Sequence, residues 1–223
     1  MSPGVESHSS ATLILDNAQF WFWNSRHVAT WPAIVGDKPA ELRYVQVVCK
    51  ISDVGPSLPA LARGAIDYWL REASDLPLGG SVGPAAPVFV SLHHRATRQL
   101  RGCMGTLAAH EPDVRHETRR CAILAAMEDP RFEPLELSDM DGISIEVTVL
   151  CPLEVITGPE FLDPKRYGVV VSDTLGRRGV LLPELEGIDD VQTQLQIVRR
   201  KAGIAPGSPV DLQRFEALRF GEH

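Results

Sequence analysis

The sequence lacks the long apolar run, about 20 residues, that a membrane-spanning helix requires. Its N-terminus has neither the basic stretch nor the apolar stretch of a secretory signal, so we expect a cytoplasmic protein with no membrane partner. Positive charge is scarce as well, because 22 Lys and Arg residues stand against 29 Asp and Glu residues, for a net charge of −7. Such a protein has little means of neutralising phosphates, and we expect no nucleic-acid partner.

Cysteine is also scarce, and its four positions form no metal-ligand pattern. Cys49, Cys103, Cys121 and Cys151 include no CxxC pair, and no histidine ladder stands near them. In a reducing compartment we expect these thiols to form no disulfides. No P-loop, GxSxG or HExxH motif occurs either, so the sequence predicts no metal and no cofactor.

What the sequence does contain is typical of a globular protein, with 44% hydrophobic and 23% charged residues among 223. Three of the four tryptophans fall within the first 31 residues, where proline and glycine interrupt short apolar pieces. Residues 44–51 alternate weakly between apolar and polar side chains, which indicates a strand. We interpret residues 1–52 as an N-terminal extension of uncertain structure and residues 53–223 as one domain.

Apolar side chains in this domain recur with helical spacing in some segments and alternate in others. Ser57 and Asp189 or Asp190 are expected as helix N-caps, and Asp113 suits the positive end of a helix. The predicted helices cover residues 58–73, 114–129 and 189–202. The predicted strands cover residues 87–93, 99–107, 142–150, 167–172 and 179–182. Antiparallel strands with helices packed on them predict an α+β fold with a mainly antiparallel sheet.

The segment QLRGCMGTL, residues 99–107, is the most unusual part of the chain. Its two glycines within four residues weaken a strand, which indicates a bulge or a close backbone approach. Arg101 and Cys103 share a strand face, where a guanidinium would favour the reactive thiolate. Ser91 and His93 are expected on the same face, so Cys103 and His93 are candidate nucleophile and base. The alternatives are a small buried thiol and a solvated histidine at a loop edge.

A second candidate segment follows the second predicted helix. Asp129 and Arg131 stand two residues apart, on either side of a proline. They either pair with each other and hold the loop, or leave Arg131 to bind an anionic ligand through two hydrogen bonds. We favour the pairing. Glu146, alone on the polar face of a predicted strand, is interpreted as solvated.

LRGCMGTL, residues 100–107, resembles the LRGCIGT signature of the AMMECR domain. Further similar blocks follow in the same order along residues 58–220: FVSL (89–92), AAMEDPRFEPL (125–135), SIEVTVLCPLEVI (144–156), YGVVV (167–171), GVLLPEL (179–185) and RRKAGI (199–204). Met104 replaces the usual isoleucine, and LPEL stands where LPQV is usual. Residues 1–52 have no counterpart in the family pattern.

The resemblance implies an α+β domain with two unequal lobes that form a cleft. It also implies that the signature residues form the functional site, namely Arg101, Gly102, Cys103, Gly105, Thr106, Asp129, Arg131 and Phe132. Bacterial and archaeal members are similar to component A of the AmmeMemoRadiSam system, so Memo-like and radical-SAM proteins are the implied partners. The family has no settled activity. Two hypotheses therefore stay open, a thiol-dependent enzyme that uses Cys103 and a binding module for a small anionic ligand or a partner segment.

Overall fold

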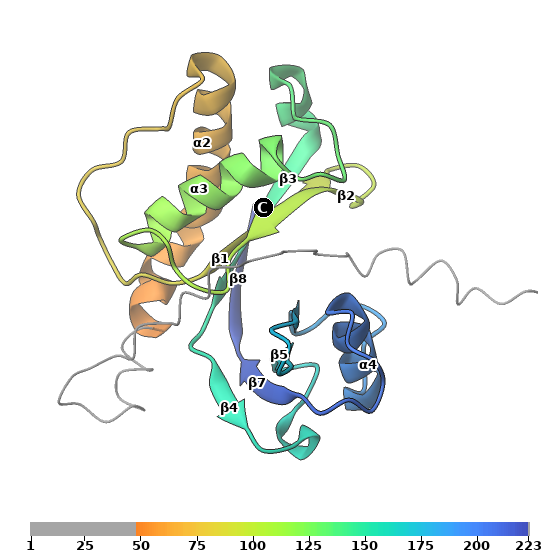
Figure 1. Ribbon diagram of the computed structural model, residues 1–223. Coiled ribbons are helices and arrows are strands. Elements are labelled where there is room, and N and C mark those ends of the chain that lie inside the picture. The colour runs from red at the N-terminus through yellow and green to blue at the C-terminus, as the bar shows by residue number, and fades with distance from the viewer. Residues whose placement is uncertain (1–47, 223) are drawn as a thin grey trace, which may run out of the picture. The chain divides into compact units, whose positions relative to one another are not determined.

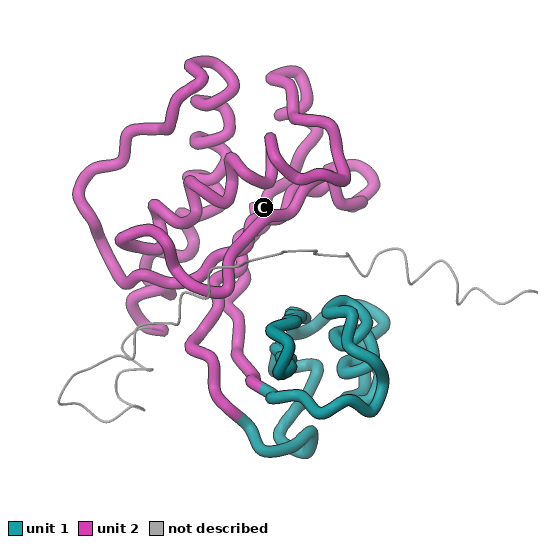
Figure 2. Tube along the Cα trace, in the orientation of Figure 1, with its two compact units in different colours: residues 1–25, 156–212 teal, residues 26–155, 213–223 magenta. Residues whose placement is uncertain are grey.

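The computed structural model describes residues 48–222, which contain two four-stranded antiparallel sheets with helices beside them (Figure 1). The strand orders are β2-β1-β3-β8 and β4-β7-β5-β6. Backbone contacts divide the described chain into two compact units of unequal size, residues 48–155 with 213–222 and residues 156–212 (Figure 2). The predicted α+β fold is therefore confirmed. The cleft stays a prediction.

The larger unit holds β1 (Val88–His94), β2 (Leu100–Gly105), β3 (Ile143–Leu150) and β8 (Ala217–Gly221). Helices α2 (Leu58–Glu72) and α3 (Val114–Met127) pack against this sheet (Figure 1). The predicted antiparallel pairing of the segments that became β1 and β2 is confirmed, and β3 pairs with the other side of β1. β2 therefore forms an edge of the sheet.

The second sheet holds β4 (Glu154–Ile156), β5 (Gly168–Ser172), β6 (Arg178–Leu181) and β7 (Asp211–Phe215). Helix α4 (Val191–Lys201) packs on β5 and β6, which form the predicted hairpin. Asp190 is its N-cap, and its side chain accepts a hydrogen bond from the Thr193 N–H at 2.8 Å. Between residues 48 and 222, no helix combines the length and apolarity that crossing a membrane demands.

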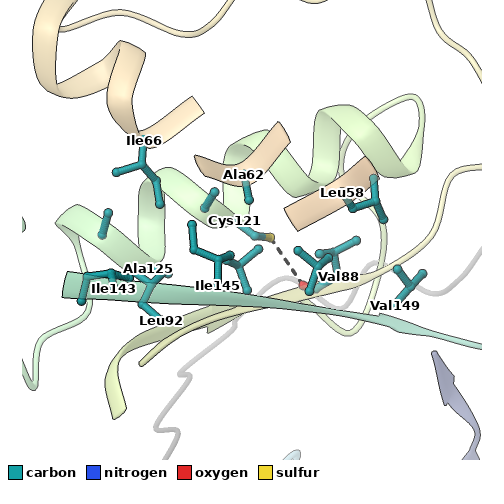
Figure 3. Close-up of a cluster of buried hydrophobic side chains, with 14 of the residues drawn as sticks. Leu58, Ala62, Ile66, Val88, Leu92, Cys121, Ala125, Ile143, Ile145 and Val149 are labelled. Carbon is teal, nitrogen blue, oxygen red and sulfur yellow. Dashed lines mark hydrogen bonds between the residues drawn. The ribbon is translucent and has the colours of Figure 1, made fainter. Parts of the chain in front are cut away.

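A single apolar cluster joins the two helices of the larger unit to its sheet (Figure 3). The alternation of β3 places its isoleucines and valines in this cluster, as the sequence predicted. The Cys121 thiol on α3 donates a weak hydrogen bond to the Val88 carbonyl oxygen at 3.5 Å. The labelled members of the cluster are Leu58, Ala62, Ile66, Val88, Leu92, Cys121, Ala125, Ile143, Ile145 and Val149. Helices α2 and α3 thus cover one face of the sheet, and the other face carries the alternate residues of each strand.

Three local expectations differ from the structure. Residues 48–54 are helical, so the strand predicted over 44–51 is wrong in its described part, because Ile51 is buried in the core from a helical turn. Residues 1–47, most of the predicted extension, lie outside the described residues. Ser57 occupies the N-cap position of α2, but its hydroxyl donates to the Val54 carbonyl oxygen at 2.7 Å instead of capping the helix. Strands β4, β7 and β8 lie outside the predicted strands.

Candidate functional site

The two glycines of the LRGCMGT segment are required by packing. A Cβ atom at Gly102 would lie well inside 3.0 Å of the Ala125 carbonyl oxygen on α3. A Cβ atom at Gly105 would lie equally close to the Phe89 ring on β1. Helix α3 therefore approaches the backbone of β2 at Gly102 more closely than any other residue would allow.

The register of β1 and β2 places a bulge beside the motif. Ser91 lies opposite Cys103, and Leu92 lies opposite Gly102, but His93 lies opposite Leu100. Arg101 is thus the extra residue of β2, without a partner in β1. The sequence predicted a bulge or a close approach for these glycines, and the structure shows both.

Cys103 is buried against Ser91. Its sulfur lies 2.9 Å from the Ser91 hydroxyl oxygen, and the residue is 3% exposed. Burial raises the pKa of the Cys103 thiol to about 12, which outweighs the lowering effect of the Ser91 hydrogen bond and the Arg131 charge. The guanidinium that acts on this thiol is therefore Arg131, not Arg101 as the strand pattern suggested. A protonated, buried thiol favours the packing interpretation over a nucleophile.

Asp129 and Arg131 pair with each other and hold the outer edge of β2. The Asp129 carboxylate accepts hydrogen bonds from the Cys103 N–H at 2.8 Å and from Arg131 Nη2 at 2.6 Å. Arg131 Nη2 also donates to the Cys103 carbonyl oxygen at 3.4 Å. Burial raises the pKa of Asp129, but the hydrogen bonds from Arg131 and Cys103 outweigh it and lower the pKa. The pair satisfies the backbone of an edge strand and blocks the addition of a foreign strand there.

Thr106 is also buried, and its hydroxyl donates to the Glu117 carboxylate at 3.0 Å. Glu117, on α3, is 0% exposed and further accepts the backbone N–H groups of His110 and Glu111 at 2.7 and 2.9 Å. Sequence reasoning missed Glu117. The sequence does contain a signal for Glu117. It is a glutamate within the apolar stripe of a helix, four residues before Cys121.

Arg101 is the motif residue with the weakest partners. Its guanidinium lies 5.9 Å from the centre of the Phe132 ring, and Arg131 lies 5.3 Å from the centre of the same ring. The nearest acceptors in the described chain are the Pro134 carbonyl oxygen at 3.5 Å and the Asp139 carboxylate at 3.9 Å. The Arg101 side chain is only 15% exposed. It is a largely buried cation, held in place by a ring and lacking a short hydrogen bond.

His93 lies on the same face of β1 as Ser91, but no hydrogen bond joins its ring to Cys103 within the described chain. His93 is half-buried, and its partner position on β3 is Ser144. Burial lowers the pKa of His93, so the ring is neutral near neutral pH. Among residues 48–222, no three His, Cys, Asp or Glu side chains are placed to hold a metal ion.

A family model described as AMMECR1 matches residues 59–221, which include every motif residue named above. The chain belongs to the AMMECR1 family. A relative from Thermotoga maritima is 43% identical over 136 residues, which cover 60% of this chain and 77% of that protein. A longer relative from Clostridium acetobutylicum is 39% identical over 157 residues, and the match spans 70% of this chain but only 31% of that protein.

The crystal structure of an uncharacterized protein from Pyrococcus horikoshii has the same fold as this AMMECR1 protein. Its TM-score is 0.70 at 31% sequence identity, and the match covers 77% of this chain and 92% of that chain. The similarity therefore confirms the family and the α+β fold.

In this AMMECR1 protein, the Cys103 thiol is expected to react with iodoacetamide at least about 100-fold more slowly than a free thiol near neutral pH, because it is protonated and buried. The rate should rise with pH, since the thiolate fraction grows until the pH approaches about 12. Cys49, which is exposed, is the internal control. Peptide mapping by mass spectrometry measures both rates, and equal labelling of Cys103 and Cys49 would restore Cys103 as a candidate nucleophile.

Proposed function

We propose that this AMMECR1 protein is a binding domain whose Arg101 guanidinium receives an anionic group. The observation that carries the proposal is the environment of Arg101, which is 15% exposed and has no acceptor closer than 3.5 Å in the described chain. A cation taken out of water without short hydrogen bonds is costly, and a carboxylate or phosphate would supply two of them. Phe132 holds the guanidinium plane in position before any ligand binds.

The remaining motif residues hold the backbone around Arg101 in place. Gly102 and Gly105 allow close packing, Thr106 is bonded to Glu117, and Asp129 holds the edge of β2. Arg131 shares the Phe132 ring with Arg101, while its own charge is paired with Asp129. The thiol-dependent enzyme is the weaker alternative, because Cys103 is buried and protonated.

The partner that we expect to supply the anionic group is a Memo-like protein, together with a radical-SAM protein, in the cytoplasm. The support for these partners is the resemblance to component A of the AmmeMemoRadiSam system. An acidic segment of the Memo-like protein would place a carboxylate on Arg101, and its affinity would depend on salt because the contact is charged.

The test is the affinity of the full chain for the Memo-like protein of the same genome, measured by isothermal titration calorimetry. Arg101→Ala is expected to weaken binding by about 10-fold or more, since it removes charge-assisted hydrogen bonds. Arg71→Ala is the matched control, because Arg71 is an exposed arginine paired with Asp67 on α2. Equal affinities for the wild type and Arg101→Ala would show that Arg101 is not the binding site.

A further inference from the structure

The sheet face opposite helices α2 and α3, here called the outer face, carries a row of small and polar residues that crosses all four strands of the larger unit. Ser91 lies opposite Cys103 on one side and opposite Glu146 on the other, and Glu146 lies opposite Gly221. Residues opposite each other in antiparallel strands point to the same face, with Cβ atoms about 5 Å apart. The four residues therefore form one continuous row.

The hydrogen bond between Cys103 and Ser91 leaves Ser91 with an acceptor for a ligand. Either group can be the donor in this 2.9 Å contact, because a hydroxyl and a protonated thiol can each donate and accept. In both arrangements the Ser91 oxygen keeps a lone pair that can accept a hydrogen bond from a ligand. Ser91 is half-buried, so solvent or a ligand reaches it.

Glu146 is the next member, and its carboxylate has no hydrogen bond or ion pair with any residue of 48–222. It is half-buried on β3, and its charge partly offsets the effect of burial on the pKa of His93. The His93 ring, one row along β1, is half-buried and neutral and likewise makes no hydrogen bond within the described chain. Its unprotonated nitrogen is an acceptor.

The row is open beside Glu146. A Cβ atom placed at Gly221, the partner of Glu146 on β8, would meet no heavy atom within 4 Å. Any other residue at position 221 would place a side chain in this space. The outer face thus presents a carboxylate, a hydroxyl and an imidazole next to an unfilled position.

We propose that the outer-face row binds a primary ammonium group, with Glu146, Ser91 and His93 as its three acceptors. An ammonium has three N–H donors and no acceptor, which complements a carboxylate oxygen, a hydroxyl oxygen and a neutral imidazole nitrogen. A divalent cation suits the site less, because one carboxylate and one imidazole supply too few ligands. Arg98, the other charge that acts on His93, is exposed and screened by solvent. The site does not involve Arg101, so it stands apart from the proposed function.

The test is a titration of the full chain with n-butylammonium, followed by NMR of the His93 ring. Saturable shifts of the ring resonances and a further decrease in the His93 pKa are expected, because binding adds a positive charge beside the ring. Glu146→Gln keeps the shape and removes the charge, and it should weaken binding by about 10-fold or more. Glu72→Gln, at an exposed glutamate on α2, should leave the affinity unchanged.

Tetramethylammonium is the control ligand, because it carries the same charge and has no N–H donor. It should produce no saturable shift. Ser91→Ala tests the site without changing its charge, because it removes only the hydroxyl acceptor. It should also weaken n-butylammonium binding. The proposal is overturned if the His93 resonances do not move, if tetramethylammonium binds as well, or if neither Glu146→Gln nor Ser91→Ala reduces the affinity.

Discussion

Replacing Glu117 with alanine is expected to lower the free energy of unfolding by about 3–5 kcal/mol. The carboxylate is 0% exposed and accepts the Thr106 hydroxyl and two backbone N–H groups, from His110 and Glu111. Alanine would leave these donors buried without partners and would open a cavity at the α3–β2 contact. Urea unfolding of the wild type and the variant, followed by circular dichroism, measures the difference.

The matched control is Glu128→Ala, at an exposed glutamate that ends the same helix, and it should change stability by less than about 0.5 kcal/mol. Glu117→Gln separates charge from shape. The glutamine amide keeps one acceptor oxygen, but its NH₂ group faces some of the donors that Glu117 accepts. Glu117→Gln should therefore also destabilise the protein, by less than Glu117→Ala does. If Glu117→Ala were as mild as Glu128→Ala, the network around Thr106 would not be needed for stability.

The sequence predicted the elements whose apolar spacing is strong. Helix α3 and strand β3 were predicted because one complete face of each is buried in the core. Strands β7 and β8 were missed because most of their residues are only half-buried, so neither strand needs a regular apolar face. The segment that ends at Ile51 shows the opposite error, because a strand is predicted there and the structure has a helix. Three alternating residues before Ile51 are consistent with a strand.

The sequence also predicted how some of the candidate residues lie, but it could not assign their roles. Local spacing correctly placed Ser91 on the face of Cys103 and correctly paired Asp129 with Arg131. Burial is a property of the whole fold, and it was burial that raised the pKa of the Cys103 thiol. Which arginine acts on that thiol likewise depends on a loop contact across 28 positions of sequence.

Replacing Gly102 with alanine is expected to destabilise the protein by about 3 kcal/mol. The new methyl group would collide with the Ala125 carbonyl oxygen, which belongs to the backbone of α3 and cannot rotate away, and would crowd a Leu92 methyl group at 3.3 Å. Helix α3 would have to move from the sheet as a unit. Urea unfolding measures the change, and Gly142→Ala is the control, because a Cβ atom there meets nothing within 4 Å. A Gly102→Ala protein as stable as Gly142→Ala would contradict the close approach.

The same collision affects how variants of the motif are interpreted. Moving α3 away from Gly102 also displaces the loop that follows it, including Asp129, which holds the Cys103 backbone. Gly102→Ala should therefore speed iodoacetamide labelling of Cys103 as well as weaken ligand binding, although Gly102 has no side chain that could bond to a ligand. Arg101→Ala removes only the side chain of the bulged residue, so it should weaken binding and leave Cys103 protected. The two variants together separate loss of function through unfolding from loss of the binding group.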